Sequence, residues 1–158
     1  MSMVMPQENK HAAAQSGERE DAGRSLARYA ATLSFDALPP AVVRVTKQCI
    51  LDVMGTTLAA TTLAPEAPLF HNYVRDVGGR EECTLIGYGE KAPAQMAALL
   101  NGCNSHMLDF DDVGSGHVSA ATISSALAMA EKARFLGKPD ATRVVADRCA
   151  ELVLGKRG

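Results

Sequence analysis

Small apolar side chains at helical spacing constrain the fold of this chain more than any other feature. The chain has 158 residues and contains 26 Ala, but only seven aromatic residues, four Phe and three Tyr. Alanine has the highest helix propensity, and a core of small side chains needs the close backbone approach found between packed helices. We therefore expect a mostly α protein, a helical bundle of about one domain, since domains typically have roughly 100–200 residues.

Apolar periodicity places the expected helices and one strand. The strongest helical pattern follows Pro40 and runs to about residue 60, and proline suits the first turn of a helix. Other helical patterns cover residues 22–33, 69–77, 93–108, 118–136 and, more weakly, 140–154. Residues 83–88, closed by Gly89, form the one strand-like run. Residues 1–21 are polar without a sustained period, so we expect a disordered leader there.

The charge balance and the cysteines bear on partners and location. The formal net charge is −2, which does not favour binding to nucleic acid or to an anionic membrane surface. Residues 81–130 contain six acidic residues and one lysine, whereas residues 131–158 contain seven basic and four acidic residues. The sequence shows neither a membrane span nor the apolar run of a signal peptide. Four cysteines without a CxxC pair indicate reduced structural thiols, and we expect a cytoplasmic protein.

One segment combines acidic and imidazole side chains. Asp109, Asp111 and Asp112 are followed by His117, in a Gly-rich loop between two apolar helices. Three interpretations are open: an Asp and His117 form an acid–base pair, the carboxylates bind a divalent cation, or an Asp caps the helix that His117 begins. His106 ends the preceding helical pattern, where it either braces the loop or supports the site.

Two stretches of the chain resemble the MmgE/PrpD family. In KAPAQMAALLNGCNSHMLDFDDVGSGHVSAATISSALAMAE the matching features are Asn101-Gly102, His106, the run LDFDD, a short Gly-rich gap, His117 and an Ala-rich helix. Upstream, LARYAATLSFDALPPAVVRVTKQCILDVMGTTLAA resembles the family's opening pair of helices. The resemblance covers about residues 25–139 and is specific, because the order and spacing of several motifs agree together.

The resemblance implies an enzyme and assigns its site. The family includes 2-methylcitrate dehydratase, cis-aconitate decarboxylase and iminodisuccinate epimerase. It implies a helical domain with a smaller lid domain and an active site between them. It also implies a homodimeric lyase that acts on a small polycarboxylate without a cofactor. By position, Asp109 and His117 fall on catalytic positions. His106, Asp111 and Asp112 are expected to bind substrate or support these two residues, and no residue is assigned to a metal.

The sequence departs from the family pattern in two respects. Val118 follows His117 where the family usually has proline. Family members are also much longer, so their lid and further active-site groups have no counterpart here. Residues 22–139 are therefore expected to form the N-terminal helical segment of such an enzyme. Residues 140–158 look like an atypical tail, as after truncation or a frameshift near Pro139, and we expect the chain alone to be inactive.

Two other functions remain open at this point. The chain could be a non-catalytic helical module of the same ancestry that dimerises. Alternatively, Asp109, Asp111 and Asp112 could serve a metal-dependent hydrolase, because hard cations favour clustered carboxylate oxygens.

Overall fold

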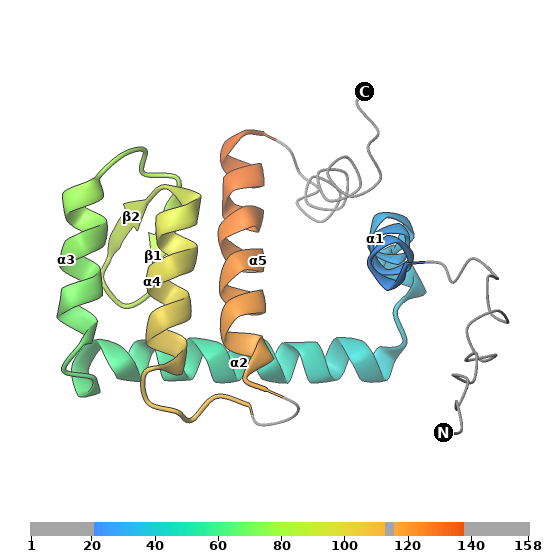
Figure 1. The fold of residues 1–158 in the computed structure, drawn as a ribbon, viewed down its shortest axis with the longest axis horizontal. Coiled ribbons are helices and arrows are strands. Elements are labelled where there is room, and N and C mark those ends of the chain that lie inside the picture. Colours follow the sequence, from blue (N-terminus) through green and yellow to red (C-terminus); the bar gives the residue numbers. More distant parts are fainter. Residues whose placement is uncertain (1–20, 113–115, 138–158) are drawn as a thin grey trace, which may run out of the picture.

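Three helices stand side by side and a longer helix crosses beneath them (Figure 1). The computed structural model describes residues 21–112 and 116–137. The elements in chain order are α1 (Ala22–Thr32), the 3₁₀ turn η1 (Phe35–Ala37), α2 (Pro40–Leu63), α3 (Ala67–Val77), β1 (Cys83–Leu85), β2 (Glu90–Ala92), α4 (Ala94–His106) and α5 (Val118–Phe135). Helices α3, α4 and α5 form the upright row, and α2 is the crossing helix. The expected mostly α class is confirmed.

The helix boundaries follow from proline and glycine. Pro40 is the first residue of α2, where its missing N–H leaves no hydrogen bond unmade. Helix α3 ends at Gly78, whose φ of 60° lies in the left-handed region that glycine adopts without strain. Pro93 directly precedes α4. The predicted helices over 22–33, 40–60, 69–77, 93–108 and 118–136 therefore agree with the structure to within a few residues, while the pattern over 140–154 lies outside the described residues.

The core is built from small side chains, as the composition predicts. Its main cluster joins α3, the strands β1 and β2, α4 and α5. Five of its eight buried residues are alanine or cysteine. Leu85 of β1 and Leu100 of α4 are the largest fully buried residues of this cluster. Helices α4 and α5 approach closely at Gly102, where an added Cβ would lie 3.7 Å from Ser124. The small residues Gly102 and Ser124 therefore lie at the contact between the two helices that carry the site.

The sequence predicted a single strand over residues 83–88, and the structure contains an antiparallel hairpin instead. Strand β1 pairs with β2 in the register Cys83↔Ala92, and the turn contains Gly87 at a φ of 89°. The second strand was missed because two of its three residues are charged and exposed. Its pairing depends on the tertiary environment rather than on an alternating pattern.

Buried threonines on α2 were also not predicted. Thr56 and Thr57 lie in the core next to Val53. Both hydroxyls donate to the carbonyl oxygen of Val53, at 3.1 and 2.6 Å. The helix backbone thereby satisfies these polar groups, so they can replace apolar side chains at buried positions.

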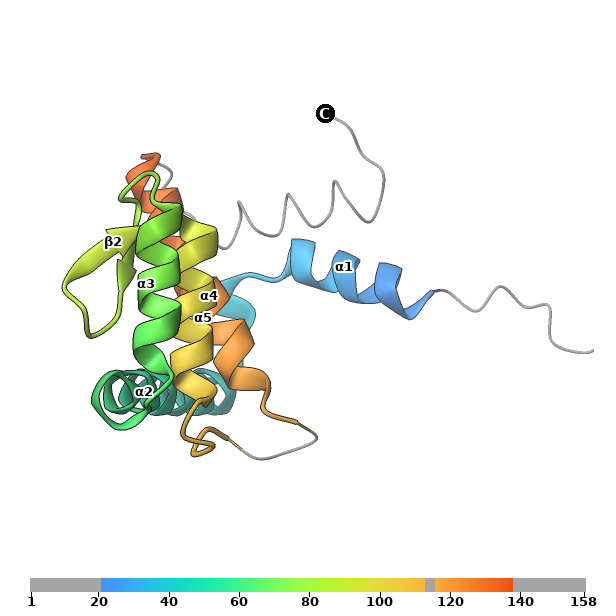
Figure 2. The ribbon, with the colours of Figure 1, turned by 60° about the vertical axis from the view of Figure 1, so that its left-hand side comes forward.

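Helix α1 and the start of α2 form the least covered part of the described chain. Figure 2 shows α1 extending away from α3, α4 and α5. Leu26 and Tyr29, on the predicted apolar face of α1, are 67% and 61% exposed, and Val45 of α2 is 56% exposed. None of the described helices combines the length and the hydropathy that a membrane crossing would require.

Candidate functional site

The segment that joins α4 to α5 holds the four side chains of the candidate site. His106 is the last residue of α4, and the amide of Asp109 donates to its carbonyl oxygen at 2.9 Å. This turn requires a φ of 54° at Asp109, which is the only non-glycine residue with positive φ among the described residues. Aspartate tolerates this conformation better than most residues, though still at some cost. The strained turn brings the Asp109 carboxylate next to the start of α5.

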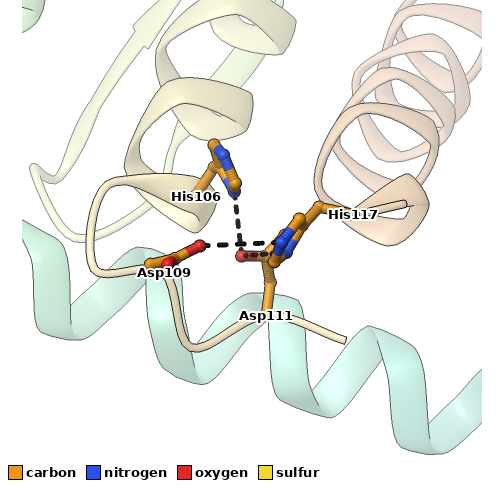
Figure 3. Close-up of side chains that lie close together, drawn as sticks. All are labelled: His106, Asp109, Asp111 and His117. Carbon is orange, nitrogen blue, oxygen red and sulfur yellow. Dashed lines mark hydrogen bonds and ion pairs between the residues drawn. The ribbon is translucent and has the colours of Figure 1, made fainter. Parts of the chain in front are cut away.

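The four side chains converge on one point (Figure 3). Oδ1 of Asp111 lies 2.9 Å from Nδ1 of His106 and 3.2 Å from Nδ1 of His117. On its other nitrogen, Nε2, His117 lies 3.6 Å from Oδ1 of Asp109. The two imidazole rings are 4.7 Å apart. Asp111 is therefore the centre of the cluster, and the residues come from the end of α4, the loop and the start of α5 (Figure 3).

The carboxylates of Asp109 and Asp111 differ in how deeply they are buried. The side chain of Asp111 is fully buried, while that of Asp109 is 80% exposed. The sequence assigned the catalytic position to Asp109 and a supporting position to Asp111. It could not show which acidic residue of the DFDD run points inward, since a loop has no fixed periodicity. The structure places the side chains of Asp109 and His117 3.6 Å apart, and both imidazoles contact Asp111.

The pKa values of His106 and Asp111 are shifted from their ordinary values in opposite directions. The hydrogen bond and the charge of Asp111 raise the pKa of His106. Burial acts to raise the pKa of Asp111, but the hydrogen bond from His106 and the charges of both imidazoles outweigh burial and lower it. Both shifts favour the ionised pair, in which His106 donates to the carboxylate.

Asp112 has a different role from its neighbours. Its Oδ1 accepts a hydrogen bond from the backbone amide of Ser119 at 3.3 Å, in the first turn of α5. His117 is the N-cap residue of that helix by position, without a side-chain capping bond of its own. The capping interpretation therefore holds for Asp112, and the structure places its carboxylate away from the convergence of the other four side chains.

A groove runs from the two imidazoles along the helices. It has a volume of about 750 Å³ and is lined by residues of α3, α4 and α5, including Phe70, Leu99 and Ala121. His106 and His117 form part of its wall. The groove is mainly apolar, and Glu66, Gln95 and Ser125 add polar groups to its lining beside the two imidazoles. The arrangement suits proton transfer to or from a ligand, because an imidazole can both accept and donate a proton.

The sequence matches a known family over most of the described chain. The model of the MmgE/PrpD N-terminal domain matches residues 24–140. Comparison of the chain with curated proteins and with solved structures gave no match. Of the described elements, the matched region includes α1 from residue 24 onward, the other four α-helices, the hairpin and the whole cluster around Asp111. Through this N-terminal domain, the chain belongs to the MmgE/PrpD family.

Proposed function

We propose that this chain contributes the acid–base part of a lyase that acts on a small polycarboxylate, in the manner of 2-methylcitrate dehydratase or cis-aconitate decarboxylase. The observation that carries the proposal is the contact between His117 and Asp109, at 3.6 Å, within a domain of the MmgE/PrpD family. The four cysteines without a CxxC pair support a cytoplasmic location, and the family resemblance suggests an enzyme that uses no cofactor.

His117 is the proposed proton-transfer group and Asp109 its carboxylate partner. An elimination next to a carboxylate needs a base that removes a carbon-bound proton and an acid that protonates the leaving group. One imidazole can do either, depending on its protonation state. Asp111 contacts Nδ1 of His117 and Asp109 lies near Nε2, so the two carboxylates hold the ring from both sides. Asp111 and His106 then act as positioning residues.

The charges near the cluster bear on substrate binding. In the described part of the chain, Asp109 and Asp111 form ion pairs only with the imidazoles of His106 and His117. A polycarboxylate needs cationic partners for its carboxylates, because an acidic site repels it. We propose that another part of the active enzyme or a second chain supplies these cations. Turnover by the 158-residue chain alone is therefore expected to be absent.

Steady-state turnover of cis-aconitate and of 2-methylcitrate tests this function. The chain is assayed alone and after fusion to the C-terminal part of an MmgE/PrpD relative. In the active fusion, His117→Ala and Asp109→Asn should each reduce kcat about 10²–10⁴-fold, the usual contribution of a general acid or base. Asp112→Asn is the matched control, because asparagine can still accept the capping bond from Ser119.

The control and the folded state decide the interpretation. Thermal melting of each variant shows whether a loss of rate reflects unfolding. Near-parental rates in both His117→Ala and Asp109→Asn would contradict the site assignment. Equal losses in these variants and in Asp112→Asn, together with lowered melting temperatures, would favour a loop-bracing role for the cluster and a non-catalytic module.

We also propose that the chain forms a homodimer through α1 and the start of α2. The support is the exposure of Leu26, Tyr29 and Val45, because large exposed apolar patches mark interfaces. Light scattering should show a dimer, and Val45→Glu should shift it toward the monomer. Gln95→Glu, at an exposed position of α4, should leave the dimer mass measured by light scattering unchanged. A monomeric parent chain that binds no hydrophobic dye would contradict the proposal.

A further inference from the structure

We infer that residues 140–154 dock as an amphipathic helix in the groove along α4 and α5, and that they cover it except at the end formed by His106 and His117. The groove has a volume of about 750 Å³ and is lined by residues of α3, α4 and α5. Its proposed occupant belongs to the same chain and lies outside the described residues. The inference concerns packing, so it does not depend on the proposed lyase activity.

The walls of the groove lack charged side chains although they face solvent. Helix α4 contains no Asp, Glu, Lys or Arg, and α5 contains none before Glu131. Yet Leu99 of α4 is 40% exposed, and Ala121 and Ser125 of α5 are exposed as well. A surface helix normally carries charged or polar side chains opposite its core face. Two adjacent helices without charges on that face are typical of helices that are covered on both sides.

The hairpin covers only one side of these helices. Asn101 of α4 bonds to the hairpin at Thr84 and Ile86, whereas Leu99 and Gly102 of the same helix line the groove. Figure 2 shows the hairpin on one side of the row formed by α3, α4 and α5, with α1 extending on the other side. The groove is therefore the side of the row that still needs a covering element.

The sequence of residues 140–154 has the pattern of a helix that docks in an apolar groove. At 3.6 residues per turn, small and apolar side chains gather on one face: Ala141, Val145, Cys149 and Leu152. Charged side chains gather on the opposite face: Arg143, Asp147 and Glu151. The apolar face matches the uncharged walls of the groove, and the charged face would then point to solvent.

The segment can reach the groove and is long enough to cover it. Helix α5 ends at Phe135, so few residues separate it from residue 140, and short connections place consecutive helices antiparallel and side by side. A helix of residues 140–154 is about 22 Å long at 1.5 Å per residue. The groove extends along α4 from Gln95 to His106, which is about 16 Å of helix.

Charge favours the antiparallel direction. Residues 138–158 contain five basic and three acidic residues, and Lys156 and Arg157 directly follow the helical pattern. An antiparallel helix brings these two residues toward the end of the groove at the imidazoles. Glu66 lines the groove, and the nearby Asp109 is 80% exposed. Opposite charges therefore attract the basic end of the segment to the acidic end of the groove.

Disulfide trapping tests the position of the segment. A helix that starts beside the end of α5 and runs back along it brings Cys149 level with the turn around Ser125. In a Cys103→Ser background, which removes the thiol of the groove wall, Ser125→Cys places a thiol in the groove. Oxidation with copper phenanthroline should join it to Cys149 of the same chain. Ala126→Cys is the matched control, because the next residue of α5 is exposed but does not line the groove.

We expect the disulfide yield from peptide mapping to be about fivefold higher for Ser125→Cys than for Ala126→Cys, because docking raises the effective concentration of Cys149 at the groove. Adding Leu152→Glu should lower the yield about tenfold, since the substitution places a charge against the apolar wall. Leu154→Glu makes the same change on the opposite face of the helix and should keep the yield.

Circular dichroism shows whether each variant keeps its helices, and the comparison of residues 125 and 126 needs no change within the segment. Equal yields at these two positions, no disulfide at either, or a disulfide that joins two chains would overturn the inference. The last result would place the segment of a second copy in the groove. Because no substrate is used, none of these results bears on whether the chain supports lyase turnover.

Discussion

Helix α4 carries two polar networks that differ in how completely their hydrogen bonds are made. At Asn101 the side-chain amide accepts from the backbone amide of Ile86 and donates to the carbonyl of Thr84, at 3.0 and 2.9 Å. Five residues later, His106 enters the cluster around Asp111, where a carboxylate oxygen is buried without a hydrogen-bond partner in the described structure. The first network is satisfied and the second is not.

The difference indicates that the two networks have different roles, one in stability and one at the candidate site. Glu131 of α5 completes the first network by accepting from both the amide and the hydroxyl of Thr84, so the hairpin is fixed between α4 and α5. A satisfied buried network stabilises one conformation. The second network contains a strained residue, Asp109, and unpartnered buried atoms. Strain and unmade bonds of this kind concentrate at functional sites, where the surrounding fold has to offset their cost.

The largest effect is expected from Asn101→Ala. The change leaves the amide of Ile86 and the carbonyl of Thr84 without their partner, and each such loss costs about 1–3 kcal/mol. We expect the free energy of unfolding to fall by about 2–4 kcal/mol, measured by urea denaturation. Gln95→Ala, at an exposed position of the same helix, should change it by less than about 0.5 kcal/mol. Equal effects of the two changes would remove the distinction between the networks.

A smaller effect is expected from Glu131→Gln. The amide keeps one acceptor oxygen for Thr84 but loses the second acceptor and the negative charge. Hydrogen bonds to charged groups are the stronger class, so the loss should be about 1 kcal/mol in the free energy of unfolding. Glu81→Gln, at an exposed position, serves as the control. An unchanged free energy of unfolding in Glu131→Gln would show that the hairpin is fixed by packing alone.

Asp112→Ala tests the capping contact that the loop makes with the first turn of α5. Removal of an N-terminal capping acceptor typically costs about 0.5–2 kcal/mol, and the 3.3 Å bond to Ser119 places this case at the lower end. Asp112→Asn should recover most of the loss, because its side-chain oxygen can accept the same bond. Thermal melting of both variants provides the measurement. If Asp112→Asn melts as low as Asp112→Ala, charge rather than capping is the cause.

The smallest effect is the pH dependence of the pair formed by His106 and Asp111. The raised pKa of His106 stabilises the fold below its unfolded value of 6.5, and this stability is lost as pH rises through the folded value. The lowered pKa of Asp111 stabilises the fold above its unfolded value of 3.8, and this stability is lost as pH falls through the folded value. The pair therefore stabilises most between pH 3.8 and 6.5.

His106→Gln checks this window. With EDTA present to exclude metal ions, the melting temperature of the variant should fall below that of the parent at pH 5.5 and approach it at pH 9. His71→Gln shows whether loss of any paired histidine gives the same profile. A difference between parent and His106→Gln that is constant across this range, or larger at pH 9, would contradict the ionised pair.

Local sequence determined the helices and the position of the candidate site. Proline at residues 40 and 93 and glycine at residue 78 set helix boundaries through backbone conformation alone. The family motif located the loop from His106 to His117, because a motif retains the order and spacing of its residues along the chain. These features depend on neighbouring residues, so they can be recognised without knowledge of the fold.

Tertiary structure alone decided the second strand, the buried threonines and the inward direction of Asp111. Strand β2 forms because Cys83–Leu85 lies beside it and α4 and α5 fix that partner. Thr57 is buried because α2 presents that face to the core, and its hydroxyl finds the Val53 carbonyl within the same helix. Asp111 points inward because the turn at Asp109 sets the direction of the chain between α4 and α5. The hydrogen bonds of Thr57 and of the Asp109 turn are local, but which helix face and which carboxylate become buried depends on how the helices pack, and sequence periodicity does not determine that packing.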